Sequence, residues 1–351
     1  MENHVVELTR QQRAHGNRVC LLTAIGDLTS ADDIRVLARW QVARWRPQLL
    51  RDLLFCVAAR QALGLQARRF DVVHVHGDWS AFLFARLVAS RVGARTLVAS
   101  VHGRTRRSAV FAPVYRAVLR GYAACYATGL DDARHLSAAC GREVPWITSG
   151  VPTEWPAANA TSCAAVTDPI DVLCVGTLTA VKNLPLAIDI ARRMPDLQFA
   201  IVGDGPDRAA LASAASSAPN VRFMGRLARS ALPAVYARSR VLLSTSISEG
   251  TPTVMLEAMA FGLPIVTSRS NDYAQVLPDA RHGIVVEPPE PEHFVRALRH
   301  YLGSADALAQ ARAVNRTRAE AFTWPRIARR VTSLMHDDRV VPSTSKEPAS
   351  P

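Results

Sequence analysis

The chain has 351 residues, 49% of them hydrophobic, and a formal net charge of +12. This length accommodates two domains with cores of their own, and no apolar run approaches the roughly 18 residues of a membrane-spanning helix. The six cysteines are scattered without CxxC spacing, which argues against a zinc cluster and for reduced thiols in a cytoplasmic protein.

The positive charge is concentrated in the first half of the chain. Residues 1–150 hold 21 Arg and no Lys against 11 acidic residues, which leaves +10 there and +2 in the remainder. A basic half can face nucleic acid, anionic lipid or a phosphorylated small molecule. Because we find no helix-turn-helix, zinc-finger or RNP pattern, we expect no nucleic-acid partner. An anionic membrane surface, approached peripherally from the cytoplasmic side, remains a candidate partner.

The chain opens with helical spacing over residues 4–14, followed by an apolar strand, RVCLLTA. Residues 33–62 are predicted to be an Arg-rich helix that breaks or kinks at Pro47. Its Trp and Leu residues suit either a core-facing helix or one that lies on an anionic membrane.

Two apolar strands with histidines come next, FDVVHVHG at residues 70–77 and TLVASVHG at 96–103. His76 and His102 lie at their carboxyl ends, where ligands bind in open parallel sheets, whereas we expect His74 to be hydrogen-bonded within its strand. The two could form a metal pair, but no acidic or cysteine ligand has a plausible spacing. We therefore predict no metal site and assign both histidines to substrate hydrogen bonding.

Strands and helices continue to alternate, which predicts doubly wound parallel sheets. The second half contains apolar strands at IDVLCVG, DLQFAIVGDG, VRFMG, SRVLLSTS, LPIVTS and HGIVVEP. The expected organisation is an N-terminal Rossmann-like domain at residues 1–150, a linker at 151–169, a C-terminal Rossmann-like domain at 170–310, helices at 311–338 that pack back towards the first domain, and a disordered tail at 339–351.

Residues 244–268, STSISEGTPTVMLEAMAFGLPIVTS, combine a loop, an apolar helix and a strand. Glu249 lies in the loop and Glu257 on the helix, and a helix N-terminus attracts phosphate. Lys182, one of two lysines in the chain, follows a glycine-bearing strand end and could serve as a point charge on a diphosphate. Ordinary surface charges at all three positions remain the alternative. The Gly203-Asp204-Gly205 turn allows close backbone approach but is weak evidence alone. The sequence contains no DxD motif, the pattern that would indicate a metal-bridged diphosphate.

The ordered series VGTLTAVKN, VGDGP, FMG and EGTPTVMLEAMAFGLPIVTS resembles the GT-B glycosyltransferases of the retaining family 4 type. FDVVHVHG, SVHG and ITSGVPTEWP resemble landmarks of that family's N-terminal domain, so the resemblance covers about residues 1–335. It implies two Rossmann-like domains facing across a cleft. It also implies metal-independent, cofactor-free transfer of a hexose-type sugar from a nucleotide diphosphate donor to a glycan, a lipid-linked or another acceptor, as in cell-envelope polysaccharide synthesis.

The resemblance assigns roles by position. Lys182 would contact the diphosphate, Glu249 the sugar, Glu257 the ribose and residues 224–226 the base. The implied catalytic residues are Glu249, Lys182 and His102, with His102 near the sugar, and the implied acceptor-side residues are His76 and Arg104. The implied donor-binding residues are Gly176, Thr177, Lys182, Asp204, Gly205, Met224, Arg226, Glu249, Gly250, Thr251, Pro252, Thr253 and Glu257.

The sequence departs from the family pattern at two places. Thr177 occupies the position where the family places a diphosphate-binding arginine, for which Arg104, Arg106 or Arg226 could substitute. Residues 1–19 align with the family's first helix, so we expect the first strand of the N-terminal domain and its glycine-rich loop to be missing. These departures leave a truncated inactive remnant open as an alternative. An epimerase or hydrolase that acts on sugar nucleotides and has the same fold is a second alternative.

Overall fold

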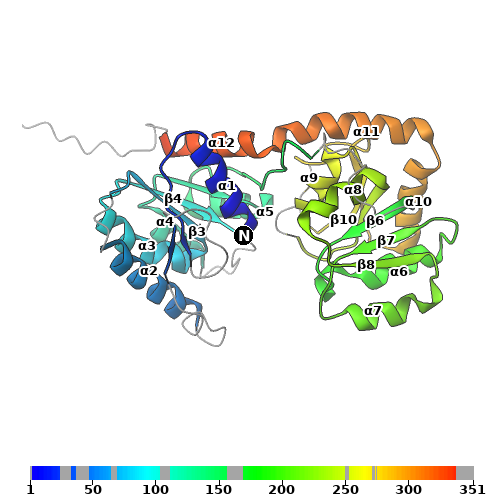
Figure 1. The fold of residues 1–351 in the computed structure, drawn as a ribbon, viewed down its shortest axis with the longest axis horizontal. Coiled ribbons are helices and arrows are strands. Elements are labelled where there is room, and N and C mark those ends of the chain that lie inside the picture. The colour runs from blue at the N-terminus through cyan, green and yellow to red at the C-terminus, as the bar shows by residue number, and fades with distance from the viewer. Residues whose placement is uncertain are drawn as a thin grey trace, which may run out of the picture. The chain divides into compact units, whose positions relative to one another are not determined.

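The structure is a computed structural model that describes residues 2–23, 33–36, 47–64, 69–102, 111–155, 169–249, 253–270, 273 and 275–336. These residues form two compact units. Unit 1 comprises residues 1–147 together with 327–351, and unit 2 comprises residues 148–326. Each unit is an α/β structure with parallel strands (Figure 1), which confirms the fold class expected from the alternation of strands and helices.

Unit 1 is built around a three-stranded parallel sheet with the order β3-β4-β5. A separate pair of two-residue strands, β1 and β2, is also parallel. The elements of this unit are α1 (Glu2–Ala14), β1 (Leu22–Thr23), β2 (Ile34–Arg35), α2 (Gln48–Gly64), β3 (Val72–Gly77), α3 (Trp79–Val92), β4 (Thr96–Val101), α4 (Phe111–Leu119), β5 (Ala124–Ala127) and α5 (Leu130–Cys140), with the greater part of α12 (Trp324–His336).

The prediction of one helix over residues 33–62 was wrong at its start. Ile34 belongs to β2, where it pairs with Leu22 and packs against the core between α2 and α3. This pairing and partial burial favour a strand over the helical pattern in the surrounding sequence. Pro47 comes just before α2, which begins at Gln48, because proline fits the start of a helix but not its interior.

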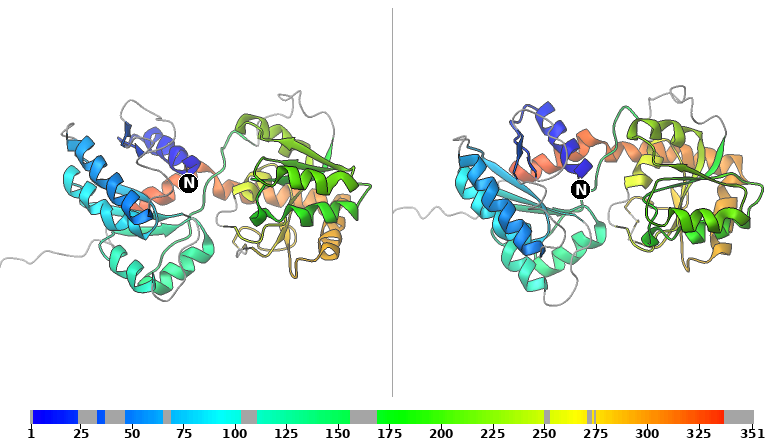
Figure 2. Two further views of the ribbon diagram at one scale, coloured as in Figure 1. Left: turned by 90° about the horizontal axis from the view of Figure 1, so that it is seen from below. Right: turned by 60° about the horizontal axis from the view of Figure 1, so that its bottom comes forward.

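Helices α2 and α3 pack side by side (Figure 2). Their shared core includes Ala59 and Leu63 from α2 and Val88 and Val92 from α3. Helix α3 has well-formed ends, since the Asp78 side chain accepts a hydrogen bond from the backbone N–H of Trp79 and Gly93 adopts a left-handed conformation at the C-cap.

Unit 2 contains a six-stranded parallel sheet with the order β11-β10-β9-β6-β7-β8. Its strands are near-continuous apolar runs because helices cover both faces. The elements are β6 (Ile170–Val175), η3 (Ala180–Lys182), α6 (Leu184–Arg192), β7 (Phe199–Val202), α7 (Arg208–Ala214), η4 (Ala215–Ser217), β8 (Val221–Gly225), η5 (Arg229–Ala231), α8 (Leu232–Arg238), β9 (Ser239–Ser244), α9 (Thr253–Ala260), β10 (Ile265–Ser268), β11 (Gly283–Val286), α10 (Pro291–Leu302), α11 (Ala305–Ala319) and η6 (Glu320–Phe322).

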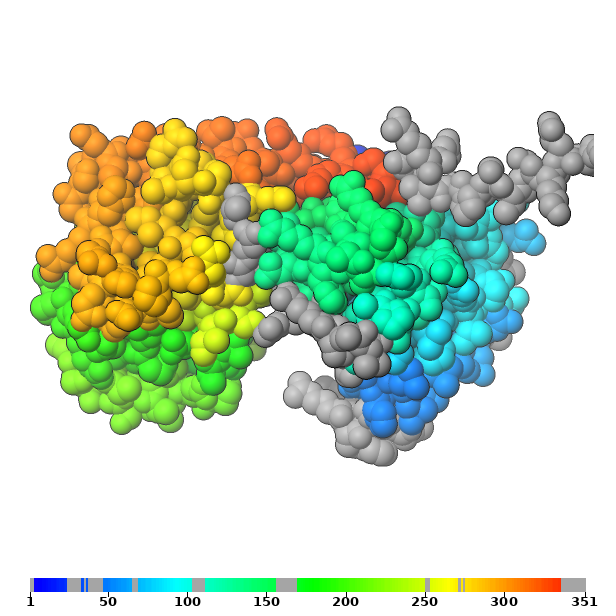
Figure 3. All heavy atoms as spheres, turned by 180° about the vertical axis from the view of Figure 1, so that it is seen from behind, coloured from blue at the N-terminus to red at the C-terminus, as the bar shows by residue number. Residues whose placement is uncertain are grey.

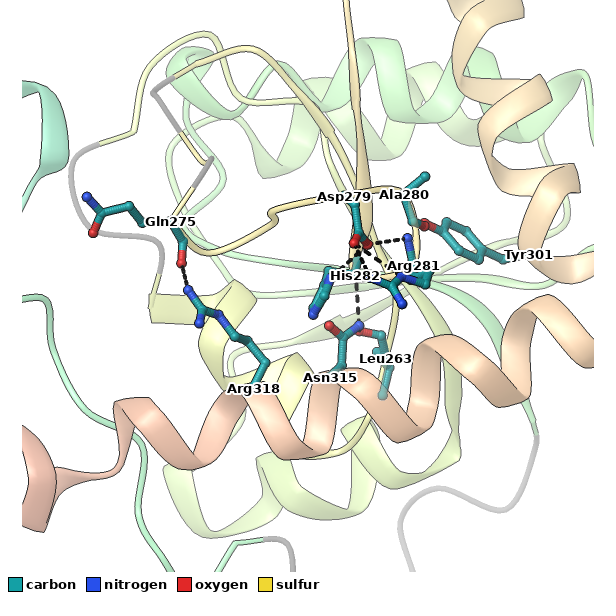
Figure 4. A network of polar contacts seen from close by, with 9 residues as sticks. All are labelled: Leu263, Gln275, Asp279, Ala280, Arg281, His282, Tyr301, Asn315 and Arg318. Atoms are coloured by element: carbon teal, nitrogen blue, oxygen red, sulfur yellow. Dashed lines mark hydrogen bonds and ion pairs between the residues drawn. The ribbon is translucent and has the colours of Figure 1, made fainter.

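Helix α9, which carries Glu257, is held in place by α11. The buried side chain of Asn315 donates hydrogen bonds to the carbonyls of Leu263, at 2.8 Å, and His282, at 2.9 Å (Figure 4). The turn after α9 requires glycine, because Gly262 has a φ of +81° and a Cβ there would lie 2.8 Å from the Arg312 carbonyl oxygen. The position of Glu257 is therefore fixed by packing from the C-terminal part of unit 2.

Within the described residues, no helix combines the length and apolar character needed to cross a bilayer.

Candidate active site

The site in unit 2 lies where the strand order of the sheet reverses. Strands β6 and β9 are the two central neighbours, with β7 and β8 on one side and β10 and β11 on the other. Ligands bind outside the carboxyl ends of strands at such a point. A cavity of about 280 Å³ opens there, and its described lining comprises Cys174, Val175, Gly176, Thr177, Lys182, Leu184, Ile201, Leu242, Leu243, Ser244, Thr245, Ser246, Glu249, Thr253, Val254 and Met255.

Lys182 and Glu249 form an ion pair at this cavity. The Lys182 Nζ donates to Glu249 Oε1 at 2.5 Å, and both side chains are partly exposed, at 25% and 17%. Asn183, directly after the lysine, has a φ of +46°, a conformation that Asn tolerates better than most residues. This residue ends η3 and precedes α6, so the sharp turn fixes the direction from which Lys182 approaches Glu249.

Hydrogen bonds fix the loop after β9 to the loop after β6. The Thr245 hydroxyl donates to the Lys182 carbonyl at 2.9 Å, and the Ile247 backbone N–H donates to the Val181 carbonyl at 2.8 Å. The Ser268 hydroxyl at the end of β10 donates to the Ser246 carbonyl at 2.6 Å. The chain around the Lys182–Glu249 pair is therefore held by hydrogen bonds among the segments that follow β6, β9 and β10, which gives a preorganised charged site.

The glycines of the Gly203-Asp204-Gly205 turn serve the packing of this region. A Cβ at Gly203, where φ is +141°, would lie 1.8 Å from the Gly176 carbonyl oxygen, and one at Gly205 would lie 2.3 Å from the Leu178 carbonyl oxygen. At Gly176 itself, a Cβ would lie 3.1 Å from Lys182 Cε. The turns after β6 and β7 thus approach each other closely, with the lysine stem across Gly176.

Glu257 lies in a second polar cluster and is only 4% exposed. Its Oε2 accepts a hydrogen bond from the Tyr236 hydroxyl at 2.9 Å, and its Oε1 lies 3.6 Å from the Arg229 guanidinium. Burial raises the pKa of Glu257, while Arg229 and the Tyr236 hydrogen bond act in the opposite direction. Both carboxylate oxygens therefore have a protein partner.

Aromatic residues surround the partners of Glu257. The Arg229 guanidinium lies over the Trp155 ring, 5.2 Å from its centroid. Tyr236 stacks on Phe261 with centroids 5.6 Å apart and contacts Trp155 at 6.2 Å. Trp155 follows the segment that enters unit 2, so the Glu257 cluster joins residues from three distant parts of the sequence.

The structure brings together only part of the predicted site. Among the described residues, the cavity takes in Gly176, Thr177, Lys182, Glu249 and Thr253. The remaining predicted residues of unit 2 lie at the neighbouring turn after β7, at the end of β8, or in the second cluster, and they are Asp204, Gly205, Met224, Arg226 and Glu257. Arg104, Gly250, Thr251 and Pro252 lie outside the described residues.

Sequence reasoning missed residues of both clusters. Thr245 and Ser246 follow β9 within the stretch singled out for its carboxylates, and their place after an apolar strand was the available signal. Tyr236, Arg229 and Trp155 gave no comparable signal, because only the folded chain brings them to Glu257.

The predicted histidines of unit 1 lie together on one face of its sheet. His76 pairs in register with Ser100 on β4, and His102 follows two residues later, so strand alternation places both histidines on the same face. His76 Nδ1 lies 3.0 Å from His102 Nε2. His74 contacts His76 with ring centroids 4.1 Å apart, but its buried Nε2 has no hydrogen-bond partner. The expectation of a hydrogen-bonded His74 was therefore wrong for this nitrogen.

Comparisons with known families agree with this architecture. Residues 1–155 match the family model "Glycosyltransferase Family 4", and residues 161–319 match the model "Glycosyl transferases group 1". The two consecutive matches together extend over both units.

Several individual proteins are similar to the chain, with sequence identities of 30% or less. The sulfoquinovosyl transferase SQD2 of Arabidopsis thaliana is 30% identical over 156 residues, which cover 44% of this chain and 30% of that protein. The phosphatidyl-myo-inositol mannosyltransferase of Mycobacterium tuberculosis is 24% identical over 303 residues, with 83% of this chain and 80% of that protein covered. The crystal structure of Anabaena HepE in complex with UDP-glucose matches with a TM-score of 0.70 and 14% identity, covering 95% of each chain.

Proposed function

Because the chain belongs to the GT-B glycosyltransferases of the family 4 type, we propose that it transfers a hexose-type sugar from a nucleotide diphosphate donor to a glycan or lipid-linked acceptor, with retention of anomeric configuration and without a metal ion on the donor diphosphate. The Lys182–Glu249 pair at the point of strand-order reversal carries this proposal.

The chemistry of the cavity supports a phosphorylated sugar as ligand. Departure of a nucleoside diphosphate develops negative charge, which the Lys182 ammonium stabilises at the phosphate oxygens. Glu249, the ion-pair partner of this lysine, accepts hydrogen bonds from hydroxyls of the donor sugar. The helix that begins at Thr253 adds the positive end of its dipole. A UDP-sugar is the first donor to test, because HepE was crystallised with UDP-glucose.

Glu257 is proposed to contact the ribose. Its oxygens already interact with the Tyr236 hydroxyl and the Arg229 guanidinium. Each carboxylate oxygen has a further lone pair that can accept a hydrogen bond from a ribose hydroxyl. In this role Tyr236 and Arg229 orient the carboxylate. The assignments of His102 to the sugar, and of His76 and Arg104 to the acceptor, stay predictions.

The donor assignment can be tested by thermal shift with UDP, GDP and ADP, each with and without Mg²⁺. A ligand that binds only the folded state raises the melting temperature, and we expect one nucleotide to do so equally in both conditions. Product NMR with the matching nucleotide-sugar then reports the anomer. Conversion of the donor in the absence of acceptor would indicate an epimerase or hydrolase instead. A Mg²⁺ requirement for binding would contradict the metal-free donor site.

We also propose that unit 1 binds an anionic membrane surface through α2 and α3. Five large apolar side chains on these helices are 37% to 45% exposed, and they are Leu49, Leu50, Val57, Leu83 and Leu87. The same two helices carry the exposed arginines Arg60, Arg86 and Arg91. In Figure 3 the blue atoms of α2 lie at the surface of the unit. Apolar side chains interspersed with cations suit insertion at an anionic headgroup layer.

Liposome co-sedimentation tests the membrane proposal. The wild type should pellet with anionic but not neutral vesicles, and salt should reverse the binding. Leu83→Gln with Leu87→Gln should weaken pelleting, whereas Val181→Ser, which alters an exposed apolar residue of unit 2, should not. Equal pelleting by all variants, or dimerisation of the wild type lost in the double variant, would contradict membrane docking by this face.

A further inference from the structure

A third histidine joins His76 and His102 in unit 1. His4 lies in the first turn of α1 and is buried together with Leu8 and Gln11 on one face of that helix. Its ring centroid lies 4.9 Å from that of His102 and 5.9 Å from that of His76. Within the part of the chain that the structure describes, one potential ligand atom from each of the three imidazoles lies within 4.8 Å of the other two.

We propose that His4, His76 and His102 bind one borderline divalent transition-metal ion, with Zn²⁺ the ion of first choice. All three residues belong to unit 1, whereas the Lys182–Glu249 pair belongs to unit 2. The proposal does not depend on the proposed function, and it assigns His76 and His102 to the ion in place of the predicted contacts with the acceptor and the sugar. It departs from the sequence-based prediction of no metal, which rested on the lack of an acidic or cysteine ligand at a plausible spacing and did not consider His4.

The geometry is close to that of a metal site. With Zn–N bonds of about 2.0–2.1 Å, two nitrogens at a tetrahedral angle lie about 3.3 Å apart. The distance of 3.0 Å between His76 Nδ1 and His102 Nε2 is near this value. The His4 nitrogen lies within 4.8 Å of both, so the His4 ring has to move only a modest distance to bind the same ion. Imidazole nitrogens suit Zn²⁺, Cu²⁺ and Ni²⁺.

The surroundings favour neutral, ligating imidazoles. Burial lowers the pKa of His4 to about 4 and that of His102 to about 2, which disfavours the protonated form of both rings. Burial also holds the pKa of His76 well below its ordinary value. Metal ligation requires this neutral form.

Hydroxyl groups lie beside two of the three rings. The Tyr126 hydroxyl lies 3.5 Å from His4 Nε2, and the Ser100 hydroxyl lies 2.9 Å from His102 Nε2. His102 Nε2 thus has two polar neighbours, Ser100 and His76, although one ring nitrogen can form a strong hydrogen bond with only one of them. A metal ion would give these crowded nitrogens a common partner, and three nitrogen ligands leave a fourth position for water.

The first experiment uses the full chain without a histidine tag, treated with a chelator and then titrated with Co²⁺ and Zn²⁺. We expect one equivalent of Co²⁺ to bind with the visible absorption of a four-coordinate ion, and Zn²⁺ to displace it. X-ray absorption of the Zn²⁺ form should give Zn–N distances of about 2.0–2.1 Å with imidazole scattering. Less than stoichiometric binding, or a six-coordinate oxygen environment, would overturn the proposal.

Two histidine variants, one in the first turn of α1 and one directly after its last residue, locate the ion. His4→Gln removes one proposed ligand and should weaken Co²⁺ binding by more than about tenfold, since even the loss of an outer partner costs about 10–100-fold. His15→Gln is the matched control, because His15 is exposed at the other end of α1 beside the Gln11 carbonyl, and it should bind as the wild type does. Equal affinity in His4→Gln would leave only a hydrogen-bonded histidine cluster. Should His4→Gln fail to fold, the wild-type absorption data still decide.

Discussion

Glu249 and Glu257 are eight residues apart in the sequence, yet their surroundings differ in kind. Glu249 is partly exposed, lines a cavity and pairs with the Lys182 ammonium. Glu257 is buried, and a tyrosine hydroxyl and a more distant guanidinium contact its two oxygens. The first carboxylate can exchange its partner for a ligand, whereas the second keeps its two protein partners when it contacts the ribose as proposed. A short sequence motif therefore contains one residue suited to contact a ligand directly and one whose removal also disturbs the fold.

The largest effect on sugar transfer is expected when Lys182, the cation paired with Glu249, is replaced. Lys182→Ala should lower sugar transfer by about 10–150-fold, because a hydrogen bond to a charged group contributes about 1.5–3 kcal/mol. Steady-state rates with a labelled donor measure the change. Lys346→Ala, which alters the other lysine of the chain, is the control and should behave as the wild type. A Lys182→Ala enzyme with full activity would remove the basis of the donor-site proposal.

Removal of the two carboxylates should have different effects on the free energy of unfolding. Glu257→Ala leaves the buried Tyr236 hydroxyl without its acceptor and should lower the free energy of unfolding by about 1–3 kcal/mol. Glu249→Ala, at a partly exposed position, should change it by less than about 1 kcal/mol while abolishing most transfer. Urea denaturation gives both values. Equal losses of stability would mean that the two sites do not differ as their burial suggests.

Thr177 offers a gain-of-function test on the Glu249 side. This exposed residue lines the cavity next to Lys182, where the family places arginine. Thr177→Arg should tighten binding of the nucleoside diphosphate by about tenfold, since it adds one charge-assisted hydrogen bond. Calorimetric titration measures the affinity, and Thr177→Gln controls for side-chain length without charge. Weaker binding in Thr177→Arg would show that the cavity has no room for the family's arginine.

The smallest effect concerns the pH dependence of stability on the Glu257 side. The folded-state pKa of Glu257 lies above its ordinary value of 4.5, so its contribution to the free energy of unfolding falls as the pH rises from 4.5 through the folded-state pKa. Arg229→Gln removes the cation that lowers this pKa and should extend the fall to higher pH. Urea midpoints across this range measure it, and Glu257→Gln added to Arg229→Gln should abolish the difference. A persistent difference in that double variant would assign the pH effect to another group.

Much of this molecule follows from its sequence. Apolar runs such as IDVLCV and SRVLLS predict strands covered on both faces, and their alternation with helices predicts the parallel sheets of both units. Lys182 was singled out after a glycine-bearing strand end and Glu249 in a loop before a helix, and the structure has them in the segments that follow β6 and β9. These features depend on local pattern and on general rules of topology, so the sequence alone suffices to find them.

Other features were decided only when the chain folded. Ile34 forms a strand because it pairs with Leu22 and packs, partly buried, against the core between α2 and α3, against the helical pattern around it. Tyr236 and Arg229 reach Glu257, and His4 reaches two histidines 72 and 98 residues away, through packing that no local spacing encodes. Burial then sets their chemistry, because removal from water raises the pKa of a carboxyl group and lowers that of an imidazole.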